Sequence, residues 1–186
     1  MTIEQDLEIQ PLAPAAADDP VVTATITDLI NEVYREGEKG LWLGDVPRTT
    51  VTEVAGLIRA GEIAVARLGG RIVGSVRIQR LDAETGEFGM LAAAPAHHGS
   101  GIGRRLVAFA EQWARDERCV AMQLELLVPQ GWTHPTKGFL AQWYDRLGYR
   151  VVRNGSIAVD FPHLAPLLAV PCDFLIYHKA LLTSSP

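Results

Sequence analysis

A glycine-rich turn between a predicted strand and a predicted helix is the feature that most restricts how this chain can fold. The turn is residues 98–104 (HGSGIGR), and it follows a strand predicted over 86–94 that stops at Pro95, which cannot donate a ladder hydrogen bond. Apolar residues then recur at helical spacing from Ile102 to Trp113. Glycine lets bare peptide N–H groups approach a ligand, and a helix N-terminus carries partial positive charge. The turn therefore suits a diphosphate.

The residues of the turn argue against two other types of phosphate-binding loop. A P-loop requires lysine and then serine or threonine after its last glycine, whereas Arg104 and Arg105 follow here. The dinucleotide fingerprint requires a third glycine at the position that Arg104 occupies. A strand-to-helix turn without a ligand is the competing interpretation, and the surrounding sequence must decide between the two.

The hydrophobic pattern of the remaining chain predicts one α/β domain without internal repeats. A capping box begins at Thr50, and Gly69-Gly70 forms a hairpin turn. On the helix after the glycine-rich turn, Glu111 and Arg115 fall on the polar side. We predict strands over 7–12, 62–68, 71–79, 86–94, 120–128, 149–153 and 173–179, and helices over 26–37, 50–61, 102–115 and 140–148.

Composition and charge exclude several classes of function. The formal net charge is -5 without a basic face, which argues against binding to nucleic acid or to anionic membranes. No apolar run is long enough to cross a bilayer, and residues 1–10 carry acids where a secretory signal would be basic. Cys119 and Cys172 are too few for a disulfide framework and lack the spacing of a metal site. We therefore expect a cytoplasmic protein without a metal.

A second motif lies downstream of the glycine-rich turn, at residues 143–149 (WYDRLGY). Together the two motifs resemble the GNAT superfamily of N-acetyltransferases, whose signature is glutamine or arginine, two residues, glycine, one residue, then glycine or alanine. Gly101 and Gly103 match this signature, and His98 replaces its first residue. The second motif is similar to the family's aromatic–tyrosine segment with its glycine–aromatic ending. The resemblance extends from about residue 62 to about residue 152.

The resemblance implies a fold and an acyl donor. The fold would be a single-domain, GNAT-like α/β fold with a mixed, mostly antiparallel sheet of about six to seven strands and about four helices. The domain, 1–186, would comprise an N-terminal strand and connection (1–20), acceptor-side helices (21–61), an acetyl-CoA-binding core (62–152) and C-terminal strands (153–186). Acetyl-CoA is the implied co-substrate. Its implied contacts are Leu91, Ala92, Ala93, Ala94, His98, Gly99, Ser100, Gly101, Ile102, Gly103, Arg104 and Arg105.

Three residues match catalytic positions of the family. Tyr144 matches the tyrosine that contacts the coenzyme sulfur and often acts as general acid, although packing beside Trp143 is its structural alternative. Glu125 matches the acid of the ribosomal-protein acetyltransferases, and Glu87 matches the acid on the preceding strand in histone-acetylating members. Burial in a central strand would raise the pKa of Glu125. The two glutamates therefore compete for the role of base, and either one could be purely structural.

The segment between the first two helices covers the acceptor in GNAT folds. In this chain it contains Glu38, Trp42 and Arg48, for which a structural loop is the competing interpretation. Lys137, in the first turn of the tyrosine helix, is expected to be solvated rather than bound to phosphate.

The resemblance implies direct transfer of an acetyl group from acetyl-CoA to a primary amine of a small molecule, a protein or a peptide. A non-catalytic acyl-CoA-binding sensor or regulatory module is the alternative, and a nucleotide-binding oxidoreductase is a weaker third hypothesis. The expected partners are acetyl-CoA and an amine acceptor, without nucleic acid or membrane, and a homodimer is left open. The amine itself stays unnamed because acceptor choice depends on loop conformation.

Overall fold

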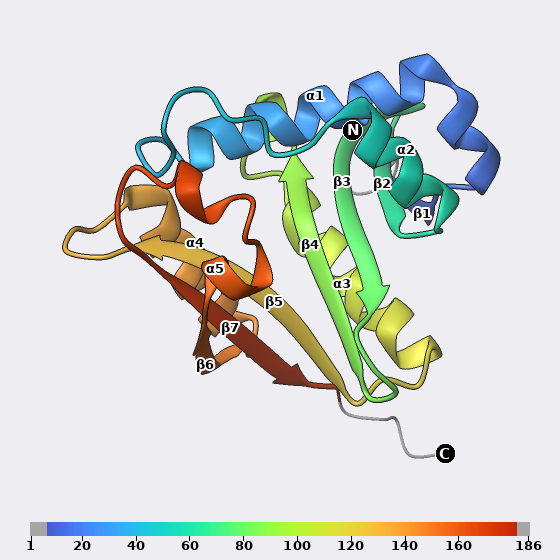
Figure 1. Cartoon of the computed structure of the whole chain (residues 1–186). Helices are drawn as coiled ribbons and strands as arrows, with labels where there is room; N and C mark the ends of the chain where they lie inside the picture. The colour runs from blue at the N-terminus through green and yellow to red at the C-terminus, as the bar shows by residue number, and fades with distance from the viewer. Residues whose placement is uncertain (1–6, 182–186) are drawn as a thin grey trace.

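The computed structural model describes residues 7–181 and contains a seven-stranded sheet of order β1-β2-β3-β4-β5-β7-β6 (Figure 1). All neighbouring strands are antiparallel except β4 and β5. The strands are β1 (Leu7–Pro11), β2 (Ile63–Leu68), β3 (Arg71–Arg80), β4 (Thr85–Ala93), β5 (Ala121–Pro129), β6 (Arg150–Gly155) and β7 (Cys172–Ala180). The α-helices are α1 (Pro20–Gly37), α2 (Val51–Arg59), α3 (Ile102–Asp116), α4 (Pro135–Arg146) and α5 (Ile157–Asp160). The predicted fold class is confirmed.

The helices cover both faces of the sheet (Figure 1). On one face, Ile26 and Ile30 of α1 share a core with Val65 of β2 and with residues of α2. On the opposite face, Leu106 of α3 and Tyr144 of α4 belong to a second core that also includes residues of the central strands. Helices α1, α2 and α3 therefore each bury apolar residues against the sheet, as an amphipathic pattern predicts.

Side chains fix the beginnings of the first two helices. Asp19 accepts hydrogen bonds from the amides of Val21 (2.9 Å) and Val22 (3.3 Å) at the start of α1. Thr50 Oγ1 accepts a hydrogen bond from the amide of Glu53 (3.1 Å) at the start of α2. The Glu53 carboxylate accepts from the hydroxyl of the preceding Thr49 (2.8 Å) rather than from the Thr50 amide. Only one half of the predicted capping box therefore forms.

The parallel strands β4 and β5 pair only near their beginnings. Their register starts at Thr85 with Ala121 and ends at Glu87 with Gln123, and beyond this point the two strands diverge (Figure 1). A parallel pair normally continues its hydrogen bonds along the strand. The divergence therefore leaves a split in the centre of the sheet.

A bulge in β4 lies just beyond the start of the split. The register between β3 and β4 shifts between the pairs Ser75–Ala92 and Arg77–Gly89. Met90 within the bulge has φ +46, a backbone conformation that is uncommon for a residue with a Cβ. Bulges bend a strand and increase its twist. The bulge therefore changes the course of β4 where it leaves β5.

Candidate active site

The first turn of α3 presents backbone amides that no protein group covers. Gly101 precedes the helix in the left-handed conformation (φ +81), and no side chain caps the helix. The first helical hydrogen bond joins Arg105 N–H to Gly101 O (3.0 Å). The amides of Ile102, Gly103 and Arg104 therefore have no hydrogen-bond partner within the described part of the chain. Because the positive end of the helix dipole lies here as well, the turn suits an anion such as a phosphate.

The loop before α3 is held by hydrogen bonds within the loop. The amide and the hydroxyl of Ser100 both donate to His97 O, at 3.1 and 2.6 Å. His98 and Gly99 are exposed, so they remain accessible to a ligand. Arg105 differs from the other predicted contacts, because its guanidinium donates to the Leu7 carbonyl of β1 (2.7 Å). The side chain of Arg105 is therefore bound to the sheet.

Residues 91–94 lie along the open edge of β4. On one side this segment pairs with β3, and on the other side no described strand pairs with β4 beyond Glu87. α3 packs directly on β3 and β4, and the Trp143 ring of α4 lies 3.7 Å from the place that a Cβ on Gly103 would occupy. The uncovered turn, the open strand edge and α4 are therefore neighbours.

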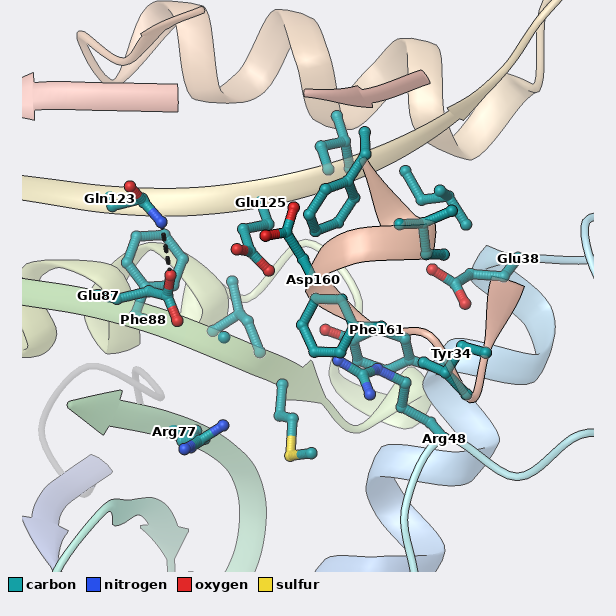
Figure 2. Close-up of a pocket in the computed structure, with 18 of the residues that line it drawn as sticks. Tyr34, Glu38, Arg48, Arg77, Glu87, Phe88, Gln123, Glu125, Asp160 and Phe161 are labelled. Carbon is teal, nitrogen blue, oxygen red and sulfur yellow. Dashed lines mark hydrogen bonds between the residues drawn. The ribbon is translucent and has the colours of Figure 1, made fainter. Parts of the chain in front are cut away.

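A cavity of about 800 Å³ lies at the split (Figure 2). The residues predicted for catalysis all line this cavity, with Glu87 on β4, Glu125 on β5 and Tyr144 on α4. Tyr34 of α1 and Arg48 of the α1–α2 connection also line it. The fold therefore brings side chains from five parts of the chain to one cavity of the size that small-molecule sites have.

Two connections that are hydrogen-bonded to each other enclose part of the cavity. Leu43 of the α1–α2 connection donates from its amide to Leu167 O (2.7 Å), and the amide of Ala169 donates to Leu41 O (2.8 Å). Leu41 is fully buried in a small core with residues of β5 and β7. The family resemblance assigns the α1–α2 connection to the acceptor side, but sequence reasoning treats residues 161–171 only as a link between strands.

A buried ion pair joins the end of α1 to the beginning of α4. Lys137 Nζ lies 2.7 Å from Glu38 Oε1, and the two side chains are 5% and 10% exposed. The indole of Trp42 donates to Glu38 Oε2 (2.7 Å). The expectation of a solvated Lys137 is wrong, because its partner is distant in the sequence and becomes a neighbour only through the fold. The pair connects elements that lie on opposite faces of the sheet.

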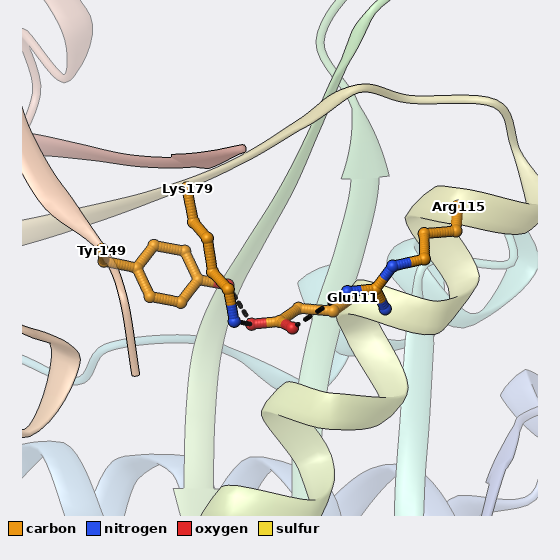
Figure 3. Close-up of polar contacts among 4 residues, drawn as sticks. All are labelled: Glu111, Arg115, Tyr149 and Lys179. Carbon is orange, nitrogen blue, oxygen red and sulfur yellow. Dashed lines mark hydrogen bonds and ion pairs between the residues drawn. The ribbon is translucent and has the colours of Figure 1, made fainter. Parts of the chain in front are cut away.

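A second buried network fixes α3 to the C-terminal strands (Figure 3). Glu111 accepts hydrogen bonds from Tyr149 Oη (2.9 Å) and Lys179 Nζ (2.7 Å), and Arg115 lies 3.5 Å from its other oxygen. Burial and the Glu111 carboxylate raise the pKa of Tyr149, so its hydroxyl remains a donor. Glu111 falls on the polar side of the helix in the sequence pattern, yet only 7% of the residue is accessible. The network holds the helix that carries the uncovered amides.

The two candidate bases differ in their hydrogen bonds. Both oxygens of Glu87 are occupied, because Gln79 Nε2 and Gln123 Nε2 each donate at 2.7 Å. Glu125 has no side-chain hydrogen bond or ion pair with a described residue. Burial, followed by the charges of Glu87 and Asp160, raises the pKa of Glu125 to about 7. Glu125 is therefore the carboxyl group that is free to exchange a proton near neutral pH.

Tyr144 is buried among aromatic rings. Its ring lies 5.0 Å from that of Trp143 and 6.1 Å from that of Phe88 between centroids, and 6% of the residue is exposed. The hydroxyl has no hydrogen-bond partner among residues 7–181. Burial, with Tyr34 and Tyr177 nearby, raises the pKa of Tyr144 above its ordinary value. Tyr144 therefore holds its proton at neutral pH and can donate it into the cavity.

The structure adds residues to the cavity that sequence reasoning missed. Tyr34 has only the helical spacing of a core residue in the sequence, yet it lines the cavity with the Arg48 guanidinium 5.3 Å from its ring centroid. Asp160 lies in the short helix α5, and Arg153 lies on β6. No local pattern marks these two residues, because Asp160 reaches the cavity through the long β6–β7 connection and Arg153 is an exposed residue of β6.

The described residues contain neither a metal-binding cluster nor a membrane-spanning helix. Within residues 7–181, no group of three or more His, Cys, Asp or Glu side chains is arranged to hold a metal ion. Within the same residues, no helix combines the length and the apolar character needed to span a membrane.

Residues 26–149 match the family described as Acetyltransferase (GNAT) family. This match and the fold together define an acyltransferase. More specifically, because the match spans well over half of the sequence, the chain belongs to the GNAT family of acetyltransferases. No curated protein matches the sequence.

Several solved structures share the fold at low sequence identity. An aminoglycoside 6'-N-acetyltransferase complexed with coenzyme A has a TM-score of 0.70 and 14% identity, over 96% of this chain and 99% of that chain. A GNAT family acetyltransferase from Elizabethkingia anophelis with acetyl-CoA bound has a TM-score of 0.63 and 16% identity, over 95% and 99%. N-acetylglutamate synthase from Neisseria gonorrhoeae, complexed with coenzyme A and N-acetyl-glutamate, has a TM-score of 0.65 and 16% identity. The similarity covers 95% of this chain but only 35% of that synthase.

The buried network around Glu111 predicts a loss of stability in the Glu111→Gln variant. The substitution removes the negative charge beside the partly buried Lys179 ammonium, so we expect the free energy of unfolding to fall by about 2 kcal/mol in urea titrations. Glu117→Gln at the end of the same helix is the control, because Glu117 pairs with Arg80 at 3.7 Å on the surface. That variant should lose less than about 0.5 kcal/mol. Equal losses in both variants would contradict this account of the network.

The raised pKa of Glu125 predicts a pH-dependent cost to stability. Because its folded pKa of about 7 exceeds the ordinary value of 4.5, folding takes up protons between these values. The free energy of unfolding therefore falls as the pH rises through this window. Glu125→Gln lacks this contribution. The difference in free energy of unfolding between Glu125→Gln and wild type should therefore shift in favour of the variant by about 1–2 kcal/mol from pH 4 to pH 8. This figure is reduced for the partial exposure of the group. Urea unfolding at both pH values measures the difference, and no difference would contradict the raised pKa.

Proposed function

We propose that the protein transfers the acetyl group of acetyl-CoA directly to the primary amine of an acceptor bound in the cavity. One observation carries the proposal: Glu125 and Tyr144 line the same cavity at the split, and Trp143, beside Tyr144 on α4, lies against Gly103 in the uncovered first turn of α3. The similar structures that hold coenzyme A or acetyl-CoA support the choice of acyl donor.

The residues at the split fit the parts of coenzyme A. The free amides of Ile102, Gly103 and Arg104 provide donors and partial positive charge for its diphosphate. The open edge of β4 at residues 91–94 offers backbone groups to the amides of the pantetheine arm. His98 and Gly99 are exposed at the beginning of the same loop. When bound, acetyl-CoA supplies the thioester that the amine attacks.

Glu125 is our choice for the base. An alkylammonium group with a pKa near 10.4 must lose a proton before its nitrogen can attack, which costs about 4–5 kcal/mol at pH 7. Glu125, with a pKa of about 7 and no competing hydrogen bond, can accept this proton directly or through one water. Glu87 is held by two glutamine side chains and is better suited to fixing the position of Gln123.

Tyr144 is our choice for the acid. The amine nitrogen forms an amide bond to the acetyl carbon while the carbon–sulfur bond breaks, and the departing thiolate requires a proton. Tyr144 is protonated and its hydroxyl has no partner among the residues that the structure describes, so it can donate this proton. The nitrogen loses its second proton as the amide forms, and this proton restores the Tyr144 hydroxyl directly or through water, while solvent removes the first proton from Glu125. No cysteine intermediate is required, because the cavity is lined by neither Cys119 nor Cys172.

The proposed acid predicts a selective loss of turnover in Tyr144→Phe. We expect kcat with an amine panel to fall by about 100-fold, the usual scale for a general acid, whereas the Kd of coenzyme A should change by less than about threefold. Tyr177→Phe is the matched control, because its ring lies 6.3 Å from that of Tyr144 but does not line the cavity. Free thiol release measures kcat, and calorimetry measures the Kd. Unchanged turnover would remove Tyr144 from the mechanism, and turnover absent from wild type would favour a non-catalytic sensor.

The proposed base predicts a change in the pH profile of the reaction. Wild-type kcat/KM should rise with pH through an apparent pKa near 7, as Glu125 ionises. In Glu125→Gln this rising limb of the profile should disappear, and kcat/KM should fall by about 100-fold. In Glu87→Gln the limb should persist but move to lower pH, because the charge of Glu87 helps to raise the pKa of Glu125. A profile that loses this limb in Glu87→Gln but keeps it in Glu125→Gln would assign the base to Glu87 instead.

A further inference from the structure

Most charged side chains of the cavity already have protein partners. Lys137 pairs with Glu38, and Arg77 pairs with Glu62 at 2.7 Å. Glu87 accepts from two glutamines, as described above. Asp82 accepts from the amides that follow it in the β3–β4 turn, and Glu53 accepts from Thr49. These groups are neutralised or hydrogen-bonded before any ligand arrives.

Four charged groups of the cavity remain available to an acceptor. Two are carboxyl groups, on Glu125 and Asp160, and two are guanidinium groups, on Arg48 and Arg153. Neither arginine forms an ion pair with a described residue. The only hydrogen bond of the Asp160 side chain within residues 7–181 comes from the Ser156 amide at 3.2 Å. The cavity thus offers two negative and two positive groups that form no ion pair with a described residue, although the charges of Arg48 and Arg153 act on Glu125 from a distance and lower its pKa.

Arg48 is the more informative of the two arginines. It is half-buried, with its guanidinium stacked over the Tyr34 ring at 5.3 Å, whereas Arg153 is exposed. Figure 2 shows the Arg48 side chain between Tyr34 and Phe161, on the same cavity that Glu125 enters from β5. The guanidinium also acts as a donor to the Tyr34 hydroxyl, and the rest of its five N–H donors stay available to a ligand. A stacked, half-buried guanidinium without an acidic partner suits a carboxylate, which it can bind with two parallel hydrogen bonds.

We propose that the acceptor is a small molecule that carries both a primary amine and a carboxylate, with its carboxylate bound by Arg48 and its amine directed to Glu125. This inference rests on the proposed function and names the substrate class of the same site. The hydrogen bonds that join the two covering connections favour a small molecule over a protein segment. A diamine would place its second positive charge against Arg48. The apolar rings of Phe161 and Phe174 provide a surface for the remainder of the molecule.

Matched pairs of acceptors test the proposal. Each pair contains an amino acid and the amine that its decarboxylation would give, namely phenylalanine with phenethylamine and lysine with cadaverine. Free thiol release from acetyl-CoA gives kcat/KM for both members with wild type, Arg48→Met, Arg48→Lys and the control Arg71→Met, at an exposed position of the β2–β3 hairpin. The kcat/KM values are compared per fraction of free amine at one fixed pH, because the members of each pair differ in amine pKa.

The expected result is a preference of wild type for the carboxylate-bearing member by about 10-fold or more, the scale of a hydrogen-bonded charge pair. In Arg48→Met this preference should fall to within about twofold through loss of activity on the amino acid alone, since the amine does not use Arg48. Arg48→Lys should retain part of the preference, and Arg71→Met should retain all of it. Equal or better use of the decarboxylated amines by wild type would overturn the proposal, as would a preference that persists in Arg48→Met.

Binding measurements separate failure of this inference from failure of the proposed function. Calorimetric titration of each pair into the protein saturated with coenzyme A reports the same preference without turnover. Tighter binding of the amino acid that depends on Arg48 supports the acceptor class, and equal binding of both members overturns it. If acetyl transfer is absent while coenzyme A binds, the proposed function fails, whatever the binding preference shows.

Discussion

The separation of β4 and β5 after the Glu87–Gln123 pair is the constraint on which the rest of the site depends. If the parallel ladder continued, the edge of β4 at residues 91–94 would be occupied by β5, and no cavity would reach the centre of the sheet. The split leaves backbone groups without a strand partner in the middle of the fold. A buried edge of this kind is costly unless a ligand or solvent satisfies it. An elongated ligand in the split can therefore satisfy the unpaired backbone groups of β4.

Because the sheet is open at its centre, contacts elsewhere must hold the surrounding elements together. Two clusters of charged side chains provide these contacts. The Glu38–Lys137 pair joins α1 to α4, and Glu111 joins α3 to Tyr149 and Lys179. Removing one partner from such a cluster is costly, because the remaining charge stays partly buried. Neither cluster contains a proposed acid or base. Both fix helices that present groups to the split, so the positions of Tyr144 and of the uncovered amides depend on them.

Local patterns in the sequence predict much of this arrangement. The alternation in β5 places Glu125 and Leu124 on opposite faces of the strand, and the spacing of the last motif places Tyr144 on a helix. The charged clusters could not be predicted in the same way. Glu111 and Lys179 are 68 residues apart, and Glu38 and Lys137 are 99 apart, so their side chains have ordinary surface spacing in the sequence. Asp160 and Arg48 reach the cavity on connections whose course depends on tertiary contacts rather than on periodicity, and Arg153 lies on the edge strand β6.

The most direct measurement of the central claim is a crystal structure of the protein with coenzyme A bound. The account predicts that the diphosphate lies on the amides of Ile102, Gly103 and Arg104, that the pantetheine arm follows the open edge of β4, and that the thiol lies within hydrogen-bonding distance of Tyr144 Oη. A diphosphate bound elsewhere, or a pantetheine arm outside the split, would contradict it.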